Sequence, residues 1–276
     1  MKSSEREYYE LEENWENFTL TAPMREKIRV LREMIPPGTG RVIDLGCGNG
    51  LLTNDLAADY SVTGVDWSVA ALGHVRAGRV CASSSDLPLR RRPADLLLCS
   101  ELLEHLLAGD FEKTIEEINR LEVPSLIISV PHDENIHRNE VRCPSCGLVF
   151  NASHHCRSFT AERLASFFPA YALRQTRVAG QAIRDYPLPL LRLRQRLGRR
   201  WYQPPRDRAF MCPSCGNRDF PRSRHNPVSL FCDGLNKLIS RRRPHWLVAL
   251  LTRSLGDQPS GACSDAVRGL LSGGAT

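Results

Sequence analysis

The sequence predicts an α/β protein built around an open, mostly parallel β-sheet. Three observations lead to this prediction. Strand-like apolar runs alternate with helical patterns over residues 41–130. The apolar run at residues 95–100, DLLLCS, is typical of a parallel strand that is buried on both faces. Residues 41–50, RVIDLGCGNG, join a strand to a helix through three glycines, at the place where open α/β sheets bind nucleotide-like ligands.

The glycine turn, residues 44–50, has the pattern D-x-G-x-G-x-G. Because glycine lacks a Cβ, the turn can adopt positive φ and a ligand can approach the backbone closely. The helix that follows points its N-terminal amides back at the ligand. The pattern is neither G-x-G-x-x-G nor a phosphate loop with Gly-Lys-Ser/Thr, which argues against both of those sites.

The other elements follow in chain order. Helices are predicted over residues 3–18, 22–35, 51–58, 69–77, 110–121, 161–168 and 228–239. Further strands are predicted over residues 62–66, 79–82, 95–100, 124–130, 171–178 and 246–252, the last of them antiparallel. The first helix is amphipathic, and we expect it either to cover the ligand pocket or to pack on the edge of the sheet.

Length and composition describe an ordinary globular protein. The 276 residues are 42% hydrophobic and 25% charged. The first residues are acidic and polar, which does not match a signal peptide, and no apolar run is long enough to span a bilayer. We therefore expect a cytoplasmic location, with cysteine thiols kept reduced.

The charge is unevenly distributed. Between Arg174 and Arg253 there are 18 Lys and Arg against 4 Asp and Glu, a local balance of +14, whereas the whole chain carries +6. Such a surface suits nucleic acid, anionic lipid or a phosphorylated substrate, but solvated arginines alone would give the same count. The aromatic residues there have no regular spacing that would indicate base stacking, so a nucleic-acid partner is not favoured.

Polar residues follow the later strands as well. Asp66 ends the second strand, 22 residues after Asp44, where a carboxylate can accept both hydroxyls of a ribose. Trp67 is next to it and is expected to cover an adenosine or to pack locally. The third strand leads to SSSDLP at residues 83–88, and the fourth to SELLEHL at residues 100–106.

With these motifs the chain resembles the class I S-adenosylmethionine (SAM)-dependent methyltransferases, whose first motif is D/E-x-G-x-G-x-G. The resemblance implies a Rossmann-like seven-stranded sheet in the order 3-2-1-4-5-7-6 and SAM as cofactor. Ser83 stands where these enzymes more often have an adenine-binding acid, although its hydroxyl can still accept a hydrogen bond. The cofactor-binding residues expected from the resemblance are Asp44, Gly46, Cys47, Gly48, Asp66, Trp67, Ser83, Ser84, Ser100 and Glu101.

His105 is the candidate catalytic residue. The E-x-L-E-H-L segment is similar to the one after the fourth strand of many O-methyltransferases. A histidine with a pKa near working pH suits a general base that acts on a hydroxyl group. The alternative is a histidine that is only hydrogen-bonded in the pocket wall.

Two copies of CPSCG, with Cys143, Cys146, Cys212 and Cys215, predict zinc binding. In the implied strand order the two inserts that carry them emerge near the same edge of the sheet, so we expect one shared, structural Zn²⁺ held by four cysteines. The competing arrangement has two ions. In that arrangement the further ligands would come from His154, His155 or Cys156 at one site and His225 or Cys232 at the other.

The segment HCRSF, residues 155–159, is similar to an H-x-R-S-F segment in bacterial methyltransferases encoded with glycan and natural-product pathways. A second resemblance concerns Glu101, Glu104, His105 and His155. Together they resemble the Mg²⁺ site of RNA 3′-terminal 2′-O-methyltransferases, where residues one helical turn apart would share the cation.

The expected organisation has three parts. Residues 1–35 form a helical cap, and residues 36–255 form the SAM-binding domain, whose inserts at 132–158 and 180–226 make a zinc ribbon. Residues 256–276 are rich in Gly, Ser and Ala and are expected to be a disordered tail. A Leu- and Arg-rich stretch, residues 181–208, predicts a short basic helix that either packs on the domain or touches a membrane surface or a lipid-linked substrate.

The expected function is SAM-dependent O-methylation of a sugar, a glycan or another small molecule. Two alternatives stay open at this point. One is a Mg²⁺-dependent RNA 2′-O-methyltransferase, and the other is a non-catalytic protein of the same fold that binds a partner.

Overall fold

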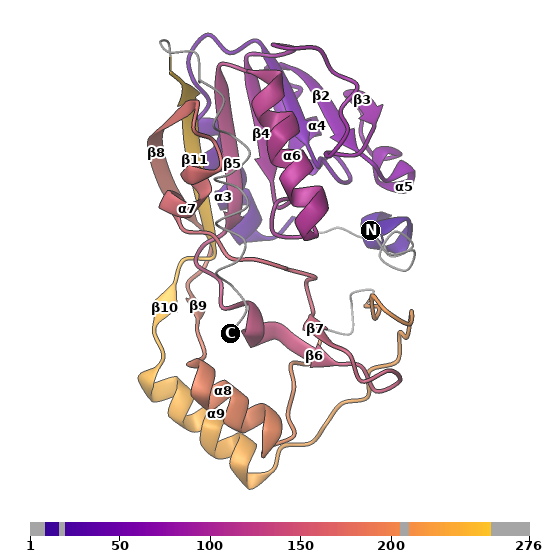
Figure 1. Ribbon diagram of the computed structural model, residues 1–276, viewed down its shortest axis with the longest axis vertical. Helices are drawn as coiled ribbons and strands as arrows, with labels where there is room; N and C mark the ends of the chain where they lie inside the picture. The colour runs from indigo at the N-terminus through magenta and orange to yellow at the C-terminus, as the bar shows by residue number, and fades with distance from the viewer. Residues whose placement is uncertain (1–8, 17–19, 205–209, 255–276) are drawn as a thin grey trace.

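A computed structural model describes residues 9–16, 20–204 and 210–254 of the chain. The main sheet has seven strands in the order β3-β2-β1-β4-β5-β11-β8 (Figure 1). The strands are β1 (Arg41–Leu45), β2 (Ser61–Asp66), β3 (Gly78–Cys81), β4 (Leu96–Ser100), β5 (Ser125–Pro131), β8 (Tyr171–Ala179) and β11 (Trp246–Arg253). The first five are parallel, and β11 runs antiparallel to β5 and β8. The predicted strand order and the antiparallel last strand are confirmed.

Helices cover both faces of this sheet. On one face α6 (Ala108–Leu121) and α7 (Ala161–Ser166) pack over the side chains that include Leu97 of β4. On the other face α3 (Ala22–Glu33) and α4 (Leu51–Leu56) pack over side chains that include Leu96 and Leu98 of β4. Successive residues of a strand point to opposite faces, so an unbroken apolar run is needed where both faces are covered.

The helix at residues 69–77 is shorter than predicted. Helix α5 (Val69–Leu72) ends before Gly73. The side chain of Asn54 donates to the carbonyl of His74 at 3.0 Å and accepts from the amide of Arg76 at 2.7 Å. These backbone groups would otherwise take part in the hydrogen bonds of a continuing helix, and the sequence pattern does not show this contact.

The predicted N-terminal helix is interrupted where the structure describes it. Only the short α2 (Glu13–Glu16) is helical over several residues, and turns separate it from Tyr9. The remaining positions of that predicted helix, 3–8 and 17–18, lie outside the described residues. The predicted tail, 256–276, also lies outside them.

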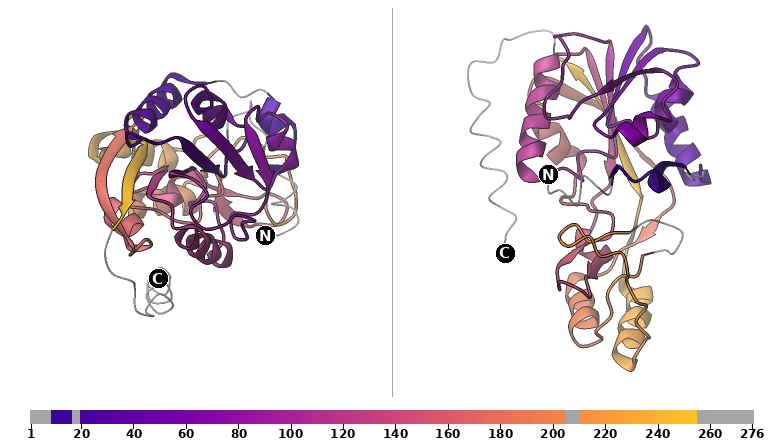
Figure 2. Two further views of the ribbon diagram at one scale, coloured as in Figure 1. Left: turned by 90° about the horizontal axis from the view of Figure 1, so that it is seen from above. Right: turned by 90° about the vertical axis from the view of Figure 1, so that its right-hand side faces the viewer.

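A second body, here called the insert lobe, consists of residues 132–158 and the described part of 180–245. It lies at the carboxyl ends of β5 and β8, below the main sheet in Figure 1 and in the right-hand view of Figure 2. Its elements are η1 (Ile136–Asn139), β6 (Glu140–Arg142), β7 (Val149–Asn151), β9 (Ile183–Arg184), α8 (Leu188–Arg196), α9 (Pro227–Ile239) and β10 (Arg242–Arg243). The structure thus adds α9 and β10 to the segments at 132–158 and 180–226.

The two helices of the insert lobe pack against each other. Tyr186, Leu190, Leu191 and Cys232 form their small apolar core. The pairing of β9 with β10 joins the start of α8 to the end of α9, so the helices run antiparallel. Among the described helices none is both long and apolar enough to cross a membrane.

Candidate functional site

A cavity of about 710 Å³ lies at the carboxyl ends of β1, β2 and β4. The side chains of Tyr9 and Trp15 also line it, so the N-terminal segment does reach the pocket. Nine of the ten residues expected to bind the cofactor line this cavity: Gly46, Cys47, Gly48, Asp66, Trp67, Ser83, Ser84, Ser100 and Glu101. The cavity is therefore where the sequence motifs converge.

The glycine turn has the backbone that its sequence predicts. Gly46, Gly48 and Gly50 have φ values of +72°, +53° and +73°, which residues with a Cβ rarely adopt. The amide of Gly48 donates to a carboxylate oxygen of Asp66 at 2.9 Å. This hydrogen bond ties the turn to the tip of β2, two positions that are far apart in the sequence.

Asp66 and Asp44 have different surroundings. The other carboxylate oxygen of Asp66 accepts from the amide of Ser68 at 2.9 Å, and this side chain lines the cavity. Asp44 is only 2% exposed and does not line the cavity; its carboxylate accepts from the Thr53 hydroxyl at 2.6 Å. Burial raises the pKa of Asp44 to about 6. Asp44 therefore supports the turn from behind.

The two serines of the loop after β3 are also distinct. The Ser84 hydroxyl is buried and lies 2.9 Å from the Thr114 hydroxyl of α6. The Ser83 hydroxyl is 2.7 Å from that of Ser85 and is exposed. Of the two, the side chain of Ser83 is thus the more accessible to a ligand.

Glu101 is held by two residues that the sequence did not single out. One carboxylate oxygen accepts from the indole nitrogen of Trp246 at 2.7 Å, and the other lies 3.6 Å from the ammonium of Lys27. That ammonium in turn lies 4.6 Å from the centre of a Trp246 ring. The three residues come from separate parts of the chain, so no local spacing could reveal the group.

His105 lies in the cavity wall beside His155, whose ring centroid is 4.7 Å away. A carboxylate oxygen of Glu134 forms a short hydrogen bond with Nδ1 of His155. Burial, together with the neighbouring His155 and His154, holds the pKa of His105 well below its usual range. The expectation of a pKa near working pH is therefore wrong, because the half-buried ring of His105 has two other histidines as neighbours. Glu134, which orients His155, was missed by sequence reasoning.

Glu104 is fully buried directly behind this pair. Within the described residues neither of its carboxylate oxygens has a hydrogen-bond partner. Burial, with the nearby Glu101 carboxylate, raises the pKa of Glu104 well above its usual range. A buried carboxyl group without a partner is costly, so it is expected to be neutral or to meet a cation.

One ligand atom from each of Glu104, His105 and His155 lies within 4.8 Å of the others. Glu101 is absent from this group because its side chain turns toward Lys27 and Trp246. The segment at residues 101–107 forms turns, not a helix, so the expectation of ligands one helical turn apart is also wrong. The residues meet because the loop with His155 folds back onto the turn after β4.

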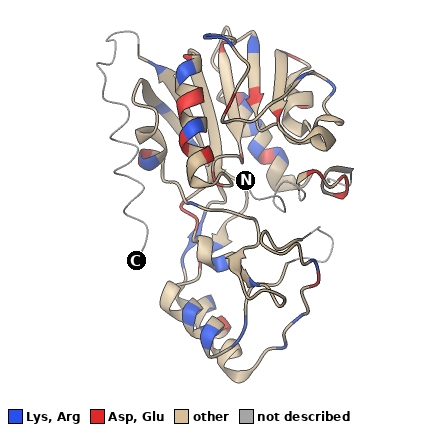
Figure 3. Cartoon of the chain, turned by 45° about the vertical axis from the view of Figure 1, so that its right-hand side comes forward, with Lys and Arg blue, Asp and Glu red and all other residues tan. Residues whose placement is uncertain are grey.

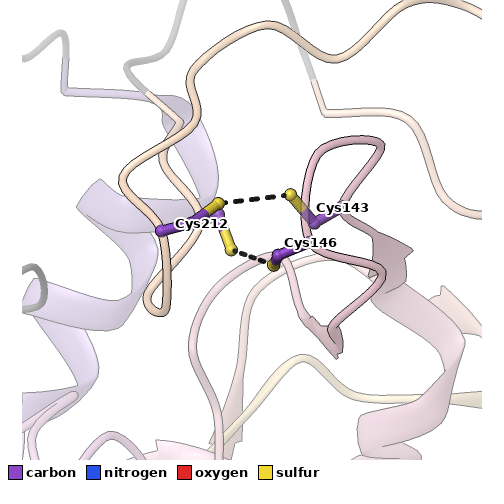
Figure 4. Close-up of side chains that lie close together, drawn as sticks. Cys143, Cys146 and Cys212 are labelled. Carbon is purple, nitrogen blue, oxygen red and sulfur yellow. Dashed lines mark hydrogen bonds between the residues drawn. The ribbon is translucent and has the colours of Figure 1, made fainter.

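The four CPSCG cysteines meet in the insert lobe (Figure 4). The Cys143 and Cys215 sulfurs are 3.7 Å apart, and the Cys146 and Cys212 sulfurs are 3.6 Å apart. Four sulfurs around one Zn²⁺ at roughly 2.3 Å would be separated by roughly 3.8 Å, so the spacing fits one tetrahedral ion.

Three of the five residues proposed for a two-ion arrangement have other surroundings. His155 belongs to the group with Glu104, and Cys232 is buried in the core between α8 and α9. His225 is 3.6 Å from a carboxylate oxygen of Asp233. The described residues thus place the four cysteines, and none of these three, in one cluster.

Comparison with known proteins finds a family match in the first half of the chain. Residues 43–125, from β1 to the start of β5, match the family model of a methyltransferase domain. An uncharacterized protein of Methanocaldococcus jannaschii is 30% identical over 104 residues, which is 36% of this chain. The matched part spans 44% of that relative's length.

Several solved structures share the fold. The N-methyltransferase NodS of Bradyrhizobium japonicum, solved with S-adenosylhomocysteine, aligns with a TM-score of 0.51 at 12% identity, over 91% of this chain and 96% of that one. A putative methyltransferase of Haloferax volcanii, solved with the activator Trm112, aligns with a TM-score of 0.51 at 15% identity, over 85% and 90%. The [4+2]-cyclase SpnF aligns with a TM-score of 0.50 at 15% identity, over 88% and 86%. At these identities the similarity establishes the fold alone.

Proposed function

We propose that this chain, whose residues 43–125 match the family model of a methyltransferase domain, transfers the methyl group of SAM to a hydroxyl oxygen of a sugar, a glycan or another small molecule. The observation that supports this proposal is the cavity itself. It combines the glycine turn at one end with the imidazole of His105, a group that can accept a proton, in its wall. A hydroxyl group that loses its proton as the methyl group arrives needs such a neighbour.

The residues around the cavity fit the parts of SAM. The amides of the glycine turn would face the cofactor, and Asp66 would accept hydrogen bonds from the ribose hydroxyls. Ser83 and the backbone of Ser84 would meet the adenine. Ser100 and Glu101, at the tip of β4, would border the methionine end, where the Glu101 carboxylate suits an amino group.

SAM supplies, when bound, a methyl group on a positively charged sulfur. The cavity walls would hold the acceptor hydroxyl in line with that group, and such positioning contributes most of the rate. His105 would accept the proton of the hydroxyl group. Glu134 fixes the ring of His155, and His155 packs edge-on against His105, so the pair would keep the base in place.

The test separates cofactor binding from the transfer step. Calorimetry with SAM should give micromolar binding for the wild type and for His105→Gln. Methyl transfer from radiolabelled SAM into sugar and small-molecule fractions should be about 10² to 10⁴ times slower for His105→Gln. His137→Gln, in the insert lobe, is the matched control and should keep the wild-type rate. Absence of SAM binding would contradict any methyltransferase, and an unchanged rate for His105→Gln would contradict its role.

A second candidate function rests on the group of Glu104, His105 and His155. The unpartnered carboxylate of Glu104 and the two imidazoles suit a divalent cation, and Glu134 would orient His155 as a carboxylate often orients a metal-bound histidine. Such a cation could activate the 2′-hydroxyl of a terminal ribose in RNA. In that case His105 is a ligand and not a base.

The two candidates respond differently to metal. Under the RNA hypothesis Mg²⁺ or Mn²⁺ is needed for methyl transfer into small RNA, and Glu104→Gln weakens Mn²⁺ binding measured by calorimetry. Under the sugar hypothesis the rate is unchanged when Mg²⁺ and Mn²⁺ are left out of the assay at the same SAM concentration. Methyl transfer into a sugar hydroxyl without any added metal would exclude a catalytic cation at Glu104, His105 and His155.

We further propose that Cys143, Cys146, Cys212 and Cys215 bind one structural Zn²⁺. The sulfur separations support this proposal. Four thiolates leave no open position on the ion, so its role would be to hold the lobe together. In the cytoplasm, which the sequence predicts, the thiols would stay reduced and available for the metal.

A further inference from the structure

Helix α9 is apolar on two opposite faces. Its inner face packs on α8 through Val228, Cys232 and Leu235. On its outer face Leu230, Phe231 and Leu238 are 57%, 63% and 83% exposed. At about 100° per residue, these three fall within an arc of about 100° on the side away from Cys232. Single exposed leucines are common, but a grouped apolar face is usually covered by something.

Two more exposed apolar side chains lie at the ends of α8. Leu197, at its last turn, is 68% exposed, and Leu188, at its start, is 43% exposed. The side-chain amide of Asn226 donates to the carbonyl of Gly198 at 2.8 Å, which brings the end of α8 next to the start of α9. The two side chains are nine residues apart, so they point to opposite sides of α8 and are not counted with the outer face of α9.

Positive charge surrounds this surface. Lys237 lies at the edge of the apolar arc, and Arg241 and Arg242 follow α9 directly; all three are exposed. Arg196 and Arg199, at the end of α8, are exposed as well. No ion pair involves these five side chains within the described part of the chain. Figure 3 shows the basic residues on the two helices.

The acidic side chains of the helix pair and its β-ribbon are half-buried and form ion pairs. Asp233 pairs with Arg194 at 2.7 Å, and Asp185 pairs with Arg243 at 3.0 Å. Within each pair the negative charge of the Asp is neutralised by the positive charge of the Arg. The unpaired charge of the outer surface is consequently all positive.

We propose that this surface, defined by Leu230, Phe231, Leu238, Lys237 and Arg241, docks the protein onto an anionic lipid bilayer. Apolar side chains on a helix that lies in the bilayer interface enter the boundary between headgroups and acyl chains, while Lys and Arg remain near the anionic headgroups. A second copy is a poorer occupant, because face-to-face pairing would bring like charges together. Helix α9 lies at the end of the molecule away from the main sheet, so docking leaves the cavity uncovered (Figure 1).

The experiment is co-sedimentation of the whole protein with vesicles of phosphatidylcholine alone or with added phosphatidylglycerol. The wild type should bind the anionic vesicles at least about tenfold more strongly than the neutral ones, and added salt should weaken the binding. Leu230→Ser, Phe231→Ser and Leu238→Ser in one chain should lower the partition constant by about tenfold or more. Equal binding of this variant and the wild type would overturn the proposal.

Three further variants make the result independent of folding defects. Arg241→Glu with Arg242→Glu keeps the apolar face and should abolish the preference for anionic vesicles. Its matched control, Arg76→Glu with Arg90→Glu, makes the same change in charge at exposed positions of the sheet domain and should bind normally. Val178→Ser, 50% exposed on β8, is the control for the apolar change. If α9 instead mediates a dimer, sedimentation velocity will show dimers that the triple serine variant dissociates, with no vesicle binding by the wild type, and the proposal fails.

Discussion

The main sheet and the insert lobe are held together in different ways. The sheet has apolar clusters on both faces, and its central strands β4 and β5 are almost completely buried. The lobe has a four-residue apolar cluster between two helices, two short β-ribbons and a cluster of four cysteines. A core as small as that of the lobe stabilises little on its own, so a metal crosslink is the expected complement. The comparison teaches that the strands that line the cavity rest on a large apolar core, whereas the lobe relies on a small core and a cysteine cluster.

The largest expected effect tests the proposed zinc. Cys143→Ser combined with Cys212→Ser should release the ion and open the lobe, since structural zinc contributes on the order of 10 kcal/mol to folding in small domains. Metal analysis measures the ion, and hydrogen exchange measures the opening of β6, β7 and the loop at residues 210–217. The sheet should keep its protection and its SAM binding. One equivalent of zinc retained in this variant would contradict the shared site.

The two apolar cores can be compared by truncation. Leu97→Ala, in the centre of β4 and fully buried, should lower the free energy of unfolding of the whole protein by about 3 kcal/mol. Leu191→Ala, 2% exposed in the lobe, should cost about 2 kcal/mol and act mainly by opening the lobe. Urea denaturation followed by circular dichroism gives the first value and hydrogen exchange the second. A single transition with equal shifts for both variants would show that the two bodies unfold as one.

The glycines of the two regions should also differ. A Cβ on Gly50 would lie 2.8 Å from Cγ2 of Val75, at a φ of +73°, so Gly50→Ala should cost about 3 kcal/mol through strain and overlap. Gly216, beside Cys215, has a φ of +70°, and a Cβ there would meet no atom within 4 Å, which leaves about 1 kcal/mol of backbone strain. Thermal unfolding compares the two. Equal losses of stability in the two variants would mean that the backbone of the glycine turn shifts to make room for the Cβ of residue 50.

The smallest effect concerns the pH dependence of the buried acid. The pKa of Asp44 is raised to about 6 in the folded protein, so folding favours its protonated form. The stability that the protonated Asp44 contributes to the folded protein is therefore present at low pH and is lost as pH rises from about 4 through about 6. Asp44→Asn stays neutral and should be more stable than the wild type at pH 8, by on the order of 1–3 kcal/mol, with the difference vanishing near pH 4.

Asp95→Asn is the matched control for this pH effect. The amides of Gly40 and Arg41 donate to the Asp95 carboxylate, and the pKa of this group lies below its usual range. Its charged form is favoured by folding, so the stability it contributes is present at neutral pH and lost as pH falls. Asp95→Asn should therefore bring no gain at pH 8. A gain for both variants, measured by thermal unfolding across pH, would show a general charge effect instead.

The sequence by itself determined the sheet and the place of the cavity. Apolar runs and the glycine turn are local patterns, and parallel strands bring their carboxyl ends to one edge, so Gly46, Asp66 and Ser100 had to meet there. The C-x-x-C spacing within each CPSCG copy predicted metal binding, and the strand order predicted that the two copies would meet. Tertiary structure alone decided how Lys27 and Trp246 hold Glu101 and how Glu134 orients His155. It also decided that the pKa of His105 falls and that Glu104 is left without a partner among the described residues. These outcomes depend on which side chains exclude water around a charge, and that is set by segments distant in sequence.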